Sequence, residues 1–374
     1  MQYLRWVKEL NGRLQGRRDV INLAGSAFHL PVATAWLDEQ IASHGKSLVA
    51  AERLATNEFG LPELTERVRA AYQIPTEREV LVTSGSTGSI RLAYQLLLAG
   101  RGPQHFIAEQ PIYEPLLSVA RRMGATVDLA PRGRGDQFID EVARRLTPAT
   151  AAVVLTNPHN PTGDLMNEQR LRALADLVAA RTREGVIVID ETFGDLSKLI
   201  GWSAGNVDER VVTINGLTKS YGLGSLRCGW LTVDRRRFPE AMNDWIEFEN
   251  IGCPWTELLG ARAIEQFDVW RPQVAAKLAA SRRTLAAWLE ETAEEGLLSH
   301  EPVGESCVVF PRWQGRTPPL ELVERLIAEH GVLVAPGEFF YPAEGMAMRV
   351  GYGIDEGLLS EGLKRLKQGL LALR

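Results

Sequence analysis

One lysine of the sequence lies where its amine could do chemistry. Lys219 belongs to a polar, glycine-rich segment that joins two apolar stretches, residues 211–214 and 230–233. An amine attacks an aldehyde only in its neutral form, so the lysine needs a lowered pKa, which burial or a nearby positive charge provides. A turn at the end of a buried sheet, with Arg227 eight residues further on, offers both. The chemistry indicated is a Schiff base. Taken alone, the segment also fits a solvated lysine in a surface turn.

A carboxylate and an amide precede Lys219 in the chain. Residues 185–190 form a continuous β-branched run that predicts a buried parallel strand, and Asp190 ends it, 29 residues before Lys219. Asn160 lies another 30 residues earlier, in the turn Asn-Pro-His-Asn-Pro-Thr-Gly. Open α/β sheets bind ligands at the carboxyl ends of their strands, so both side chains are expected there. Without a ligand, the aspartate suits a helix cap and the prolines mark a plain turn.

A third segment has the form of an anion site. Residues 79–83 predict a strand, Ser84-Gly85-Ser86-Thr87-Gly88 a turn of small residues, and residues 90–98 a helix. This order presents free backbone N–H groups to a phosphate at a helix N-terminus. It is neither a Walker motif nor the Gly-x-Gly-x-x-Gly fingerprint. The turn also works as an ordinary helix cap.

Together these segments resemble the fold-type I, class I/II aminotransferases, which bind pyridoxal 5′-phosphate. The family's lysine motif is Ser/Thr-x-Ser/Thr-Lys, then an arginine eight residues later and a Gly-Trp or Gly-Tyr pair; Thr218, Lys219, Arg227 and Gly229-Trp230 match it. Asn-Pro-x-Asn-Pro-Thr-Gly is among the more specific family signatures, and the resemblance covers nearly the whole chain in the family's order and spacing.

The resemblance implies a role for each candidate residue. Lys219 would form the Schiff base with the cofactor and later act as general base and acid, while Asp190 would pair with the protonated pyridine nitrogen. Asn160 would donate a hydrogen bond to the ring oxygen O3′, and Tyr113 would stack on the ring. The phosphate would be held by a set of small and basic residues: Gly85, Ser86, Thr87 and Arg227, with Thr218 beside Lys219.

The substrate contacts implied lie near the two ends of the chain. Arg349, in Met348-Arg349-Val350-Gly351-Tyr352, would clamp the α-carboxylate through a bidentate pair, although an arginine on an edge strand often faces solvent. Asn160 and Gly25 would also contact the substrate, because the segment 21–31 would pass over the site and a glycine allows close approach. The same segment also fits a loop across the core surface.

Three positions depart from the family pattern. Gly216 stands where a hydroxyl is usual in the lysine motif, and Ala55 where a tyrosine commonly reaches across the dimer to the phosphate. Phe193, three residues after Asp190, replaces a tyrosine that would give O3′ a second hydrogen bond. The loss of such a bond should cost about 1 kcal/mol and should change the pKa of the Schiff base rather than abolish binding.

Composition excludes several other functions. The 374 residues are 45% hydrophobic and 24% charged, as in ordinary globular proteins. A formal charge of −5 and a pI near 5.8 argue against nucleic acid or an anionic membrane as partner. Three cysteines, Cys228, Cys253 and Cys307, lack disulfide or metal-ligand patterns, so no metal is expected. The N-terminus does not resemble a signal peptide and no long apolar run is present, which favours a cytoplasmic protein.

The expected fold is α/β, with a large domain built on a mostly parallel seven-stranded sheet between helices. A smaller α/β domain would combine the N-terminal segment with the C-terminal third. We expect residues 1–40 in the small domain, 41–255 in the large one and 256–374 in the small one. An amphipathic helix is predicted in residues 1–20 and a long helical stretch in 256–289, broken at Trp270-Arg271-Pro272. A homodimer is expected from the resemblance.

The expected activity is transfer of an amino group between an L-amino acid and a 2-oxo acid. The three departures near the cofactor keep a second outcome open: the same fold and cofactor in a lyase, decarboxylase or amino-acid cyclase of specialised metabolism. A third class is a cofactor-binding regulator carrying a DNA-binding head. The net charge and the lack of room for a winged helix before residue 20 argue against it.

Overall fold

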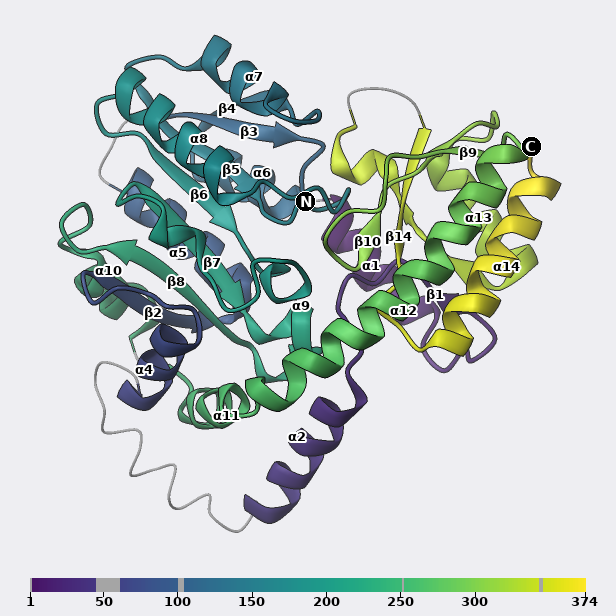
Figure 1. Ribbon diagram of the computed structural model, residues 1–374, viewed down its shortest axis with the longest axis horizontal. Helices are drawn as coiled ribbons and strands as arrows, with labels where there is room; N and C mark the ends of the chain where they lie inside the picture. Colours follow the sequence, from purple (N-terminus) through teal and green to yellow (C-terminus); the bar gives the residue numbers. More distant parts are fainter. Residues whose placement is uncertain (1, 45–60, 100–103, 251, 343–345) are drawn as a thin grey trace.

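The computed structural model describes residues 2–44, 61–99, 104–250, 252–342 and 346–374. It shows two α/β lobes that lie side by side, with the long helix α12 (Phe267–Glu294) running from one to the other (Figure 1). The helix α2 (Pro31–His44) projects from the lower edge of this view. Among the described residues, no helix is both long and apolar enough to cross a membrane.

The large lobe is built on one seven-stranded sheet, as predicted. Its strands are β2 (Arg78–Ser84), β3 (His105–Gln110), β4 (Thr126–Pro131), β5 (Thr150–Thr156), β6 (Val186–Asp190), β7 (Val211–Gly216) and β8 (Cys228–Asp234). Their order is β2-β8-β7-β6-β5-β3-β4, and only β8 runs antiparallel to its neighbours. The carboxyl ends of β2, β5, β6 and β7 therefore point the same way, which gathers the residues that follow them.

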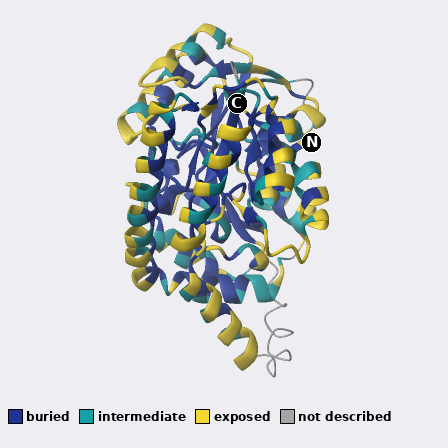
Figure 2. Cartoon of the chain, turned by 90° about the vertical axis from the view of Figure 1, so that its right-hand side faces the viewer, coloured by how far each residue is buried: buried dark blue, intermediate teal, exposed yellow. Residues whose placement is uncertain are grey.

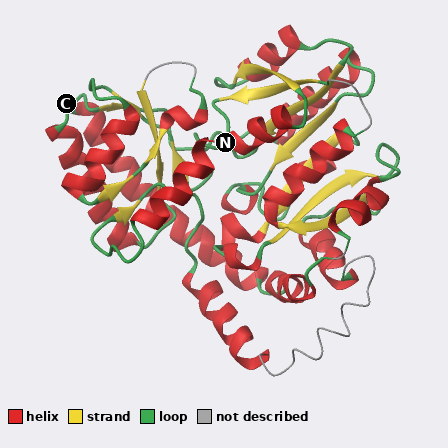
Figure 3. Ribbon diagram, turned by 180° about the vertical axis from the view of Figure 1, so that it is seen from behind, coloured by secondary structure: helices red, strands yellow, loops and turns green. Residues whose placement is uncertain are grey.

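Helices cover both faces of this sheet, as the buried dark blue strands in Figure 2 and the red helices in Figure 3 show. The helices of the lobe are α4 (Pro62–Ala71), α5 (Gly85–Leu98), α6 (Glu114–Arg122), α7 (Gln137–Arg145), α8 (Glu168–Arg181), α9 (Leu217–Tyr221), α10 (Ala241–Glu249) and α11 (Pro254–Ile264). One core cluster joins the sheet to α5, α6 and α10, and another joins it to α7 and α8. The central strands are buried on both sides, which explains their continuous apolar runs.

The small lobe combines the two ends of the chain. It contains α1 (Gln2–Arg13), β1 (Ile21–Asn22), α12, β9 (Leu298–Ser299), β10 (Val308–Val309), β11 (Arg312–Trp313), α13 (Pro319–His330), β12 (Val332–Leu333), β13 (Ala335–Pro336), β14 (Met346–Gly351) and α14 (Glu356–Ala372). β14 pairs with β10 and β11, and also with β13, so it lies inside its sheet. This position removes the edge-strand interpretation of Arg349.

Some predicted boundaries differ from the structure. The break expected at residues 270–272 lies instead between α11 and α12, at Glu265 and Gln266, and Pro272 is inside α12. Pro272 leaves the carbonyl of Asp268 without a helical donor, but Asp268 is exposed and water can replace it. α11 packs on α4 of the large lobe, and the domain limits at residues 40 and 255 stay predictions.

Candidate active site

Lys219 lies in one turn of helix, α9, rather than in an open loop. Its Nζ donates a hydrogen bond to Ser26 Oγ at 2.8 Å. Burial, followed by the positive charge of Arg349, lowers the pKa of Lys219 to about 8. Gly222 ends α9 in the left-handed conformation, with φ at 72°. The lysine therefore has the lowered pKa that a Schiff-base amine needs.

The segment 24–30 crosses α9 closely. The backbone N–H of Phe28 donates to the carbonyl of Lys219 at 2.7 Å, and a Cβ on Gly222 would lie 2.7 Å from the Phe28 carbonyl oxygen. The expectation that this segment passes the site is thus met at Lys219 itself. Ser26 was not predicted as a site residue; its hydroxyl within this segment was the available signal.

Asp190 ends β6 and is held by its neighbour Thr192. The backbone N–H and the hydroxyl of Thr192 donate to Asp190 Oδ1 at 3.0 and 2.7 Å. Burial raises the pKa of Asp190, while these hydrogen bonds and the charge of Lys219 oppose the rise. Because burial destabilises the charged form of this carboxylate, a cationic partner would stabilise it strongly. No sequence motif pointed to Thr192, although an aspartate commonly accepts a hydrogen bond from the backbone N–H two residues further on.

Asn160 is positioned by a buried polar network under the Asn-Pro-Thr-Gly turn. Its backbone N–H donates to Thr156 Oγ1 at 2.8 Å, and Thr156 donates from its own N–H and hydroxyl to Glu109 Oε1, both at 2.7 Å. Arg132 Nη1 donates to Glu109 Oε2 at 2.7 Å. Burial raises the pKa of Glu109 to about 7, with Arg132 opposing the rise. The network fixes the turn from behind and leaves the Asn160 amide facing Arg349.

Arg349 is fully buried, not solvated. Its Nη1 donates to Asn160 Oδ1 at 3.0 Å, and its Nη2 donates to Tyr3 Oη at 2.8 Å and to the Ala24 carbonyl at 2.7 Å. Its Nε is buried and has no acceptor among the described residues. A buried guanidinium with donors to spare is suited to a carboxylate ligand. No sequence motif pointed to Tyr3, just as none pointed to Ser26.

The predicted anion site lies at the start of α5. The helix begins at Gly85, five residues earlier than expected, because the small-residue turn is its first turn; among the described residues no side chain caps it at Ser84. Gly85 has φ at 71°, and a Cβ there would lie 2.5 Å from Arg227 Nη2. Arg227 also donates to the Ser84 carbonyl at 3.2 Å. Ser86 and Thr87 follow Gly85, so uncapped N–H groups and a guanidinium meet in one place.

Two glycines allow backbone segments next to the predicted anion site to approach each other closely. A Cβ on Gly229 would lie 2.5 Å from the backbone carbon of Gly85 and 2.7 Å from the N of Ser86. A Cβ on Gly216 would lie 2.8 Å from the Cys228 carbonyl oxygen. The glycine at 216, a departure from the family pattern, is explained by the close approach of β7 and β8, which leaves no space for a hydroxyl side chain.

The other predicted site residues differ in how far they are buried and in what they contact. Tyr113 directly precedes α6 and is half-buried, and its ring meets the ring of Tyr3 edge-on at 6.1 Å. Through Tyr3, whose hydroxyl accepts from Arg349 Nη2 at 2.8 Å, Tyr113 is linked to the arginine. Phe193 is buried in the core. Thr218 is half-buried beside Lys219. Gly25 is exposed, and a Cβ there would meet no described atom within 4 Å. Ala55 lies outside the described residues.

The gathered residues fit pyridoxal phosphate. An amine of lowered pKa, a buried carboxylate at a strand end, and an uncapped helix N-terminus with an arginine match its aldehyde, ring nitrogen and phosphate. Among the described residues, no cluster of His, Cys, Asp and Glu is placed to hold a metal ion.

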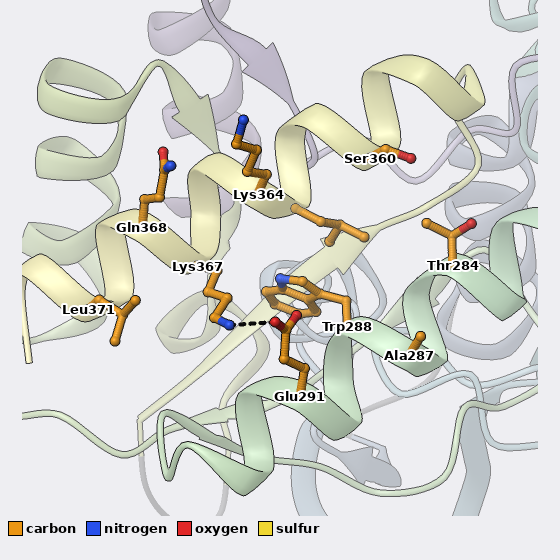
Figure 4. A pocket seen from close by; sticks show the side chains of 10 residues that line it. Thr284, Ala287, Trp288, Glu291, Ser360, Lys364, Lys367, Gln368 and Leu371 are labelled. Carbon is orange, nitrogen blue, oxygen red and sulfur yellow. Dashed lines mark hydrogen bonds and ion pairs between the residues drawn. The ribbon is translucent and has the colours of Figure 1, made fainter.

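A surface hollow of about 670 Å³ lies elsewhere, between α12 and α14 (Figure 4). It is lined by Trp288, Glu291, Lys364, Lys367 and neighbours from these two helices, and includes none of the residues above. The hollow is therefore separate from the candidate active site.

Comparisons with known proteins agree with this geometry. Residues 18–366 match the family model described as "Aminotransferase class I and II". Capreomycidine synthase from Streptomyces vinaceus is 29% identical over 317 residues, which cover 82% of this chain and 79% of that one. A protein described as "Probable N-succinyldiaminopimelate aminotransferase" from Mycobacterium tuberculosis is 30% identical over 286 residues, covering 72% and 69%.

The fold is also that of solved aminotransferases. A PLP-dependent aminotransferase from Streptococcus suis superimposes with a TM-score of 0.81 at 22% identity, covering 98% of this chain and 97% of that one. The family match spans every residue of the site except Tyr3, and the two-lobed fold brings those residues together. The chain therefore belongs to the class I and II aminotransferases, and it is a pyridoxal-phosphate-dependent transaminase of the aspartate aminotransferase fold.

Proposed function

We propose that the protein transfers an amino group between an L-amino acid and a 2-oxo acid, with Lys219 as the catalytic amine. One observation carries the proposal. Lys219 and Arg349 come from distant parts of the chain, yet both bond to one short segment: Lys219 Nζ donates to Ser26 Oγ at 2.8 Å and Arg349 Nη2 to the Ala24 carbonyl at 2.7 Å. A carboxylate anchor beside an amine of lowered pKa places the Cα–H bond of an amino acid within reach of a base.

Each of the site residues then has a defined role. Arg349 binds the α-carboxylate, and Asn160, fixed through Thr156, orients that guanidinium. Lys219 takes the Cα proton as a neutral amine and returns it as an ammonium. The hydroxyl of Ser26 accepts from Lys219 Nζ and limits the directions in which the amine can point.

The cofactor would be held at three points. Gly85, Ser86, Thr87 and Arg227 would bind its phosphate, and Asp190 would pair with its ring nitrogen. Tyr113 would cover one face of the ring, with Phe193 and Thr218 close to it. When bound, pyridoxal phosphate supplies an aldehyde with which amines condense and a ring that accepts the electrons of the broken Cα–H bond.

The test is conversion of single amino acids to 2-oxo acids in the presence of a 2-oxo acid acceptor. We expect Lys219→Ala to abolish turnover and covalent trapping of the cofactor by borohydride. Lys367→Ala, in the hollow between α12 and α14 and paired with Glu291 and Glu295, is the matched control and should keep full activity. Borohydride labelling at a residue other than Lys219 would overturn the proposal.

Cyclisation or elimination at the same site is the second candidate. It is favoured by the similarity to capreomycidine synthase along 82% of the chain. A transaminase needs an amino acceptor and a cyclase or lyase does not. Turnover of an amino acid without any added 2-oxo acid would therefore favour the second candidate, and strict dependence on the acceptor would favour the first.

We also propose that the protein is a cytoplasmic homodimer of two-domain subunits. Cys228, Cys253 and Cys307 are all unpaired, as expected for a reducing compartment. Ile41 on the projecting α2 is 57% exposed and Val269 at the start of α12 is 55% exposed, and a second copy would cover such apolar side chains. Light scattering should report twice the mass of the 41.4 kDa chain.

A further inference from the structure

The hydrogen bonds of Arg349 leave its guanidinium incompletely used. An arginine has five N–H donors, one on Nε and two on each Nη. Nη2 spends both of its donors on Tyr3 Oη and the Ala24 carbonyl, and Nη1 spends one on Asn160 Oδ1. Nε has no acceptor among the described residues, although the side chain is fully buried. A carboxylate that binds two nitrogens along either edge of the guanidinium must share Nη2, so one present partner of Nη2 has to yield.

Tyr3 is the partner that can yield without loss. The carbonyl oxygen of Ala24 only accepts hydrogen bonds, whereas a tyrosine hydroxyl both accepts and donates. The Tyr3 ring is packed against Phe340 at 5.5 Å and meets Tyr113 edge-on at 6.1 Å, so the ring is held while its O–H can turn. Turned toward an incoming carboxylate, the hydroxyl changes from an acceptor of Arg349 into a donor to the ligand.

A buried carboxylate of the other lobe keeps Tyr3 in place. Glu114, at the start of α6, accepts from the backbone N–H of Gln2 through Oε1 at 2.5 Å and from the N–H of Tyr3 through Oε2 at 2.8 Å. A carboxylate at a helix N-terminus satisfies free donors and opposes the helix dipole. Glu114 follows Tyr113 directly in the chain, so α1 is tied to the lobe that would hold the cofactor.

We propose that Tyr3 is a substrate-binding residue whose hydroxyl donates a hydrogen bond to the α-carboxylate beside Arg349, and that Glu114 positions Tyr3. This inference deepens the proposed function and rests on Arg349 being the carboxylate anchor. The inference adds the first helix to the active site. α1 covers the side of the site where the substrate carboxylate binds, and hydrogen bonds to Glu114 of the large lobe hold the N-terminus of this helix.

The test uses 3-phenylpropionate, a carboxylate without an amine, and a Tyr3→Phe variant that keeps the ring. Binding is read from the absorbance of the cofactor-loaded protein. In the cofactor-free protein it is read from the rate at which trypsin cuts α1 at Arg5 and Lys8, which are exposed. We expect Tyr3→Phe to weaken binding about tenfold, as for a hydrogen bond to a charged group. KM for amino acids should rise by the same factor with kcat changed less than twofold.

Glu114→Gln supplies the second variant, because its amide places N–H groups against the N–H groups of α1. It should raise KM like Tyr3→Phe, speed tryptic cleavage of α1, and add nothing further in the double variant. Tyr94→Phe, which removes a buried hydroxyl bonded to the Leu116 carbonyl at 2.7 Å, is the matched control and should bind the ligand normally.

Unchanged affinity in Tyr3→Phe, or additive effects of the two variants, would overturn the inference. Arg349→Lys separates it from the proposed function. If Arg349→Lys binds 3-phenylpropionate as tightly as the wild type, the carboxylate anchor itself is wrong. If Arg349→Lys loses binding and Tyr3→Phe does not, the anchor stands and only the role of Tyr3 falls.

Discussion

Lys219 owes its lowered pKa to its surroundings more than to its neighbours in the sequence. Burial is the largest cause and the charge of Arg349, 130 residues away in the chain, is the next. With a pKa of about 8, about one amine in ten is neutral at pH 7, against about one in three thousand for an ordinary lysine. The structure thus prepares the amine for attack on an aldehyde.

The pH dependence of cofactor uptake tests this state. The rate at which cofactor-free protein takes up pyridoxal phosphate should rise about tenfold per pH unit below pH 8 and level off above it, since only the neutral amine reacts. Stopped-flow absorbance between pH 6 and 10 measures it. Arg349→Gln removes a positive charge and should move the break to higher pH. A rate that keeps rising to pH 10 in the wild type would show that the lysine is not perturbed.

Some site residues stand in a recognisable local motif, whereas others are identified only by contacts with residues far away in the chain. Lys219, Asp190 and Asn160 could be predicted, because each stands at a strand end within a specific local motif. Ser26, Tyr3 and Thr192 were missed. Ser26 reaches Lys219 through a contact between residues 193 apart in the chain, and Tyr3 reaches Arg349 within the small lobe across 346 residues. No local sequence pattern records contacts of such long range.

At the scale of elements, α9 is clamped by a buried polar cluster. Asp195, five residues after the end of β6, accepts from Tyr221 Oη at 2.5 Å and from Tyr72 Oη at 2.7 Å. Arg271 of α12 lies 3.4 Å from both Asp195 oxygens and stacks over Phe267 at 4.7 Å. Tyr221 is two residues after Lys219, so this cluster joins the catalytic turn to the helix that links the lobes.

Removing the central carboxylate should therefore destabilise the fold. We expect Asp195→Ala to lower the free energy of unfolding by about 3–5 kcal/mol, because two buried hydroxyls and the half-buried guanidinium of Arg271 lose their partner. Urea unfolding followed by tryptophan fluorescence measures the change. Glu324→Ala, which breaks an exposed pair with Arg13, serves as control and should change stability far less. Equal effects in both variants would show that the cluster does not stabilise the fold.

Element boundaries were less predictable than element types. The sequence predicts the start of α5 too late, because the serines and glycines of its first turn have low helix propensity. The N-terminus of the helix is set instead by the predicted anion site. The break in residues 256–289 is predicted at Trp270-Arg271-Pro272, but α12 continues through that proline, where Phe267 stacks on Tyr221 at 4.4 Å and Arg271 pairs with Asp195 at 3.4 Å. In both places packing outweighed local preference.

For the whole molecule, the two lobes touch backbone to backbone beside the site. The N–H of Glu305 in the small lobe donates to the Gly163 carbonyl, in the Asn-Pro-Thr-Gly turn, at 2.7 Å. A Cβ on Gly304 would lie 2.1 Å from the same oxygen. The contact fixes the distance between the lobe that bears Asn160 and the one that bears Arg349.

Widening this contact should impair catalysis. Gly304→Ala must push the lobes apart, and displacements of about 1 Å can cost up to a hundredfold in rate, so we expect kcat/KM to fall at least about tenfold. Steady-state kinetics measures the fall. Gly12→Ala is the control, since a Cβ there meets no described atom within 4 Å. Full activity in Gly304→Ala would mean that the lobes adjust freely.

The corner formed by Gly85, Gly216 and Gly229 has a consequence for anyone who redesigns this enzyme. At Gly216 and Gly229 main chain meets main chain, and Gly85, with a positive φ, faces the Arg227 guanidinium, so a side chain at any of the three is disfavoured. Random libraries built across the gene would lose nearly all members altered at these three codons, whatever substrate is selected. New specificities must therefore come from positions where side chains, rather than backbone, fill the space around the site.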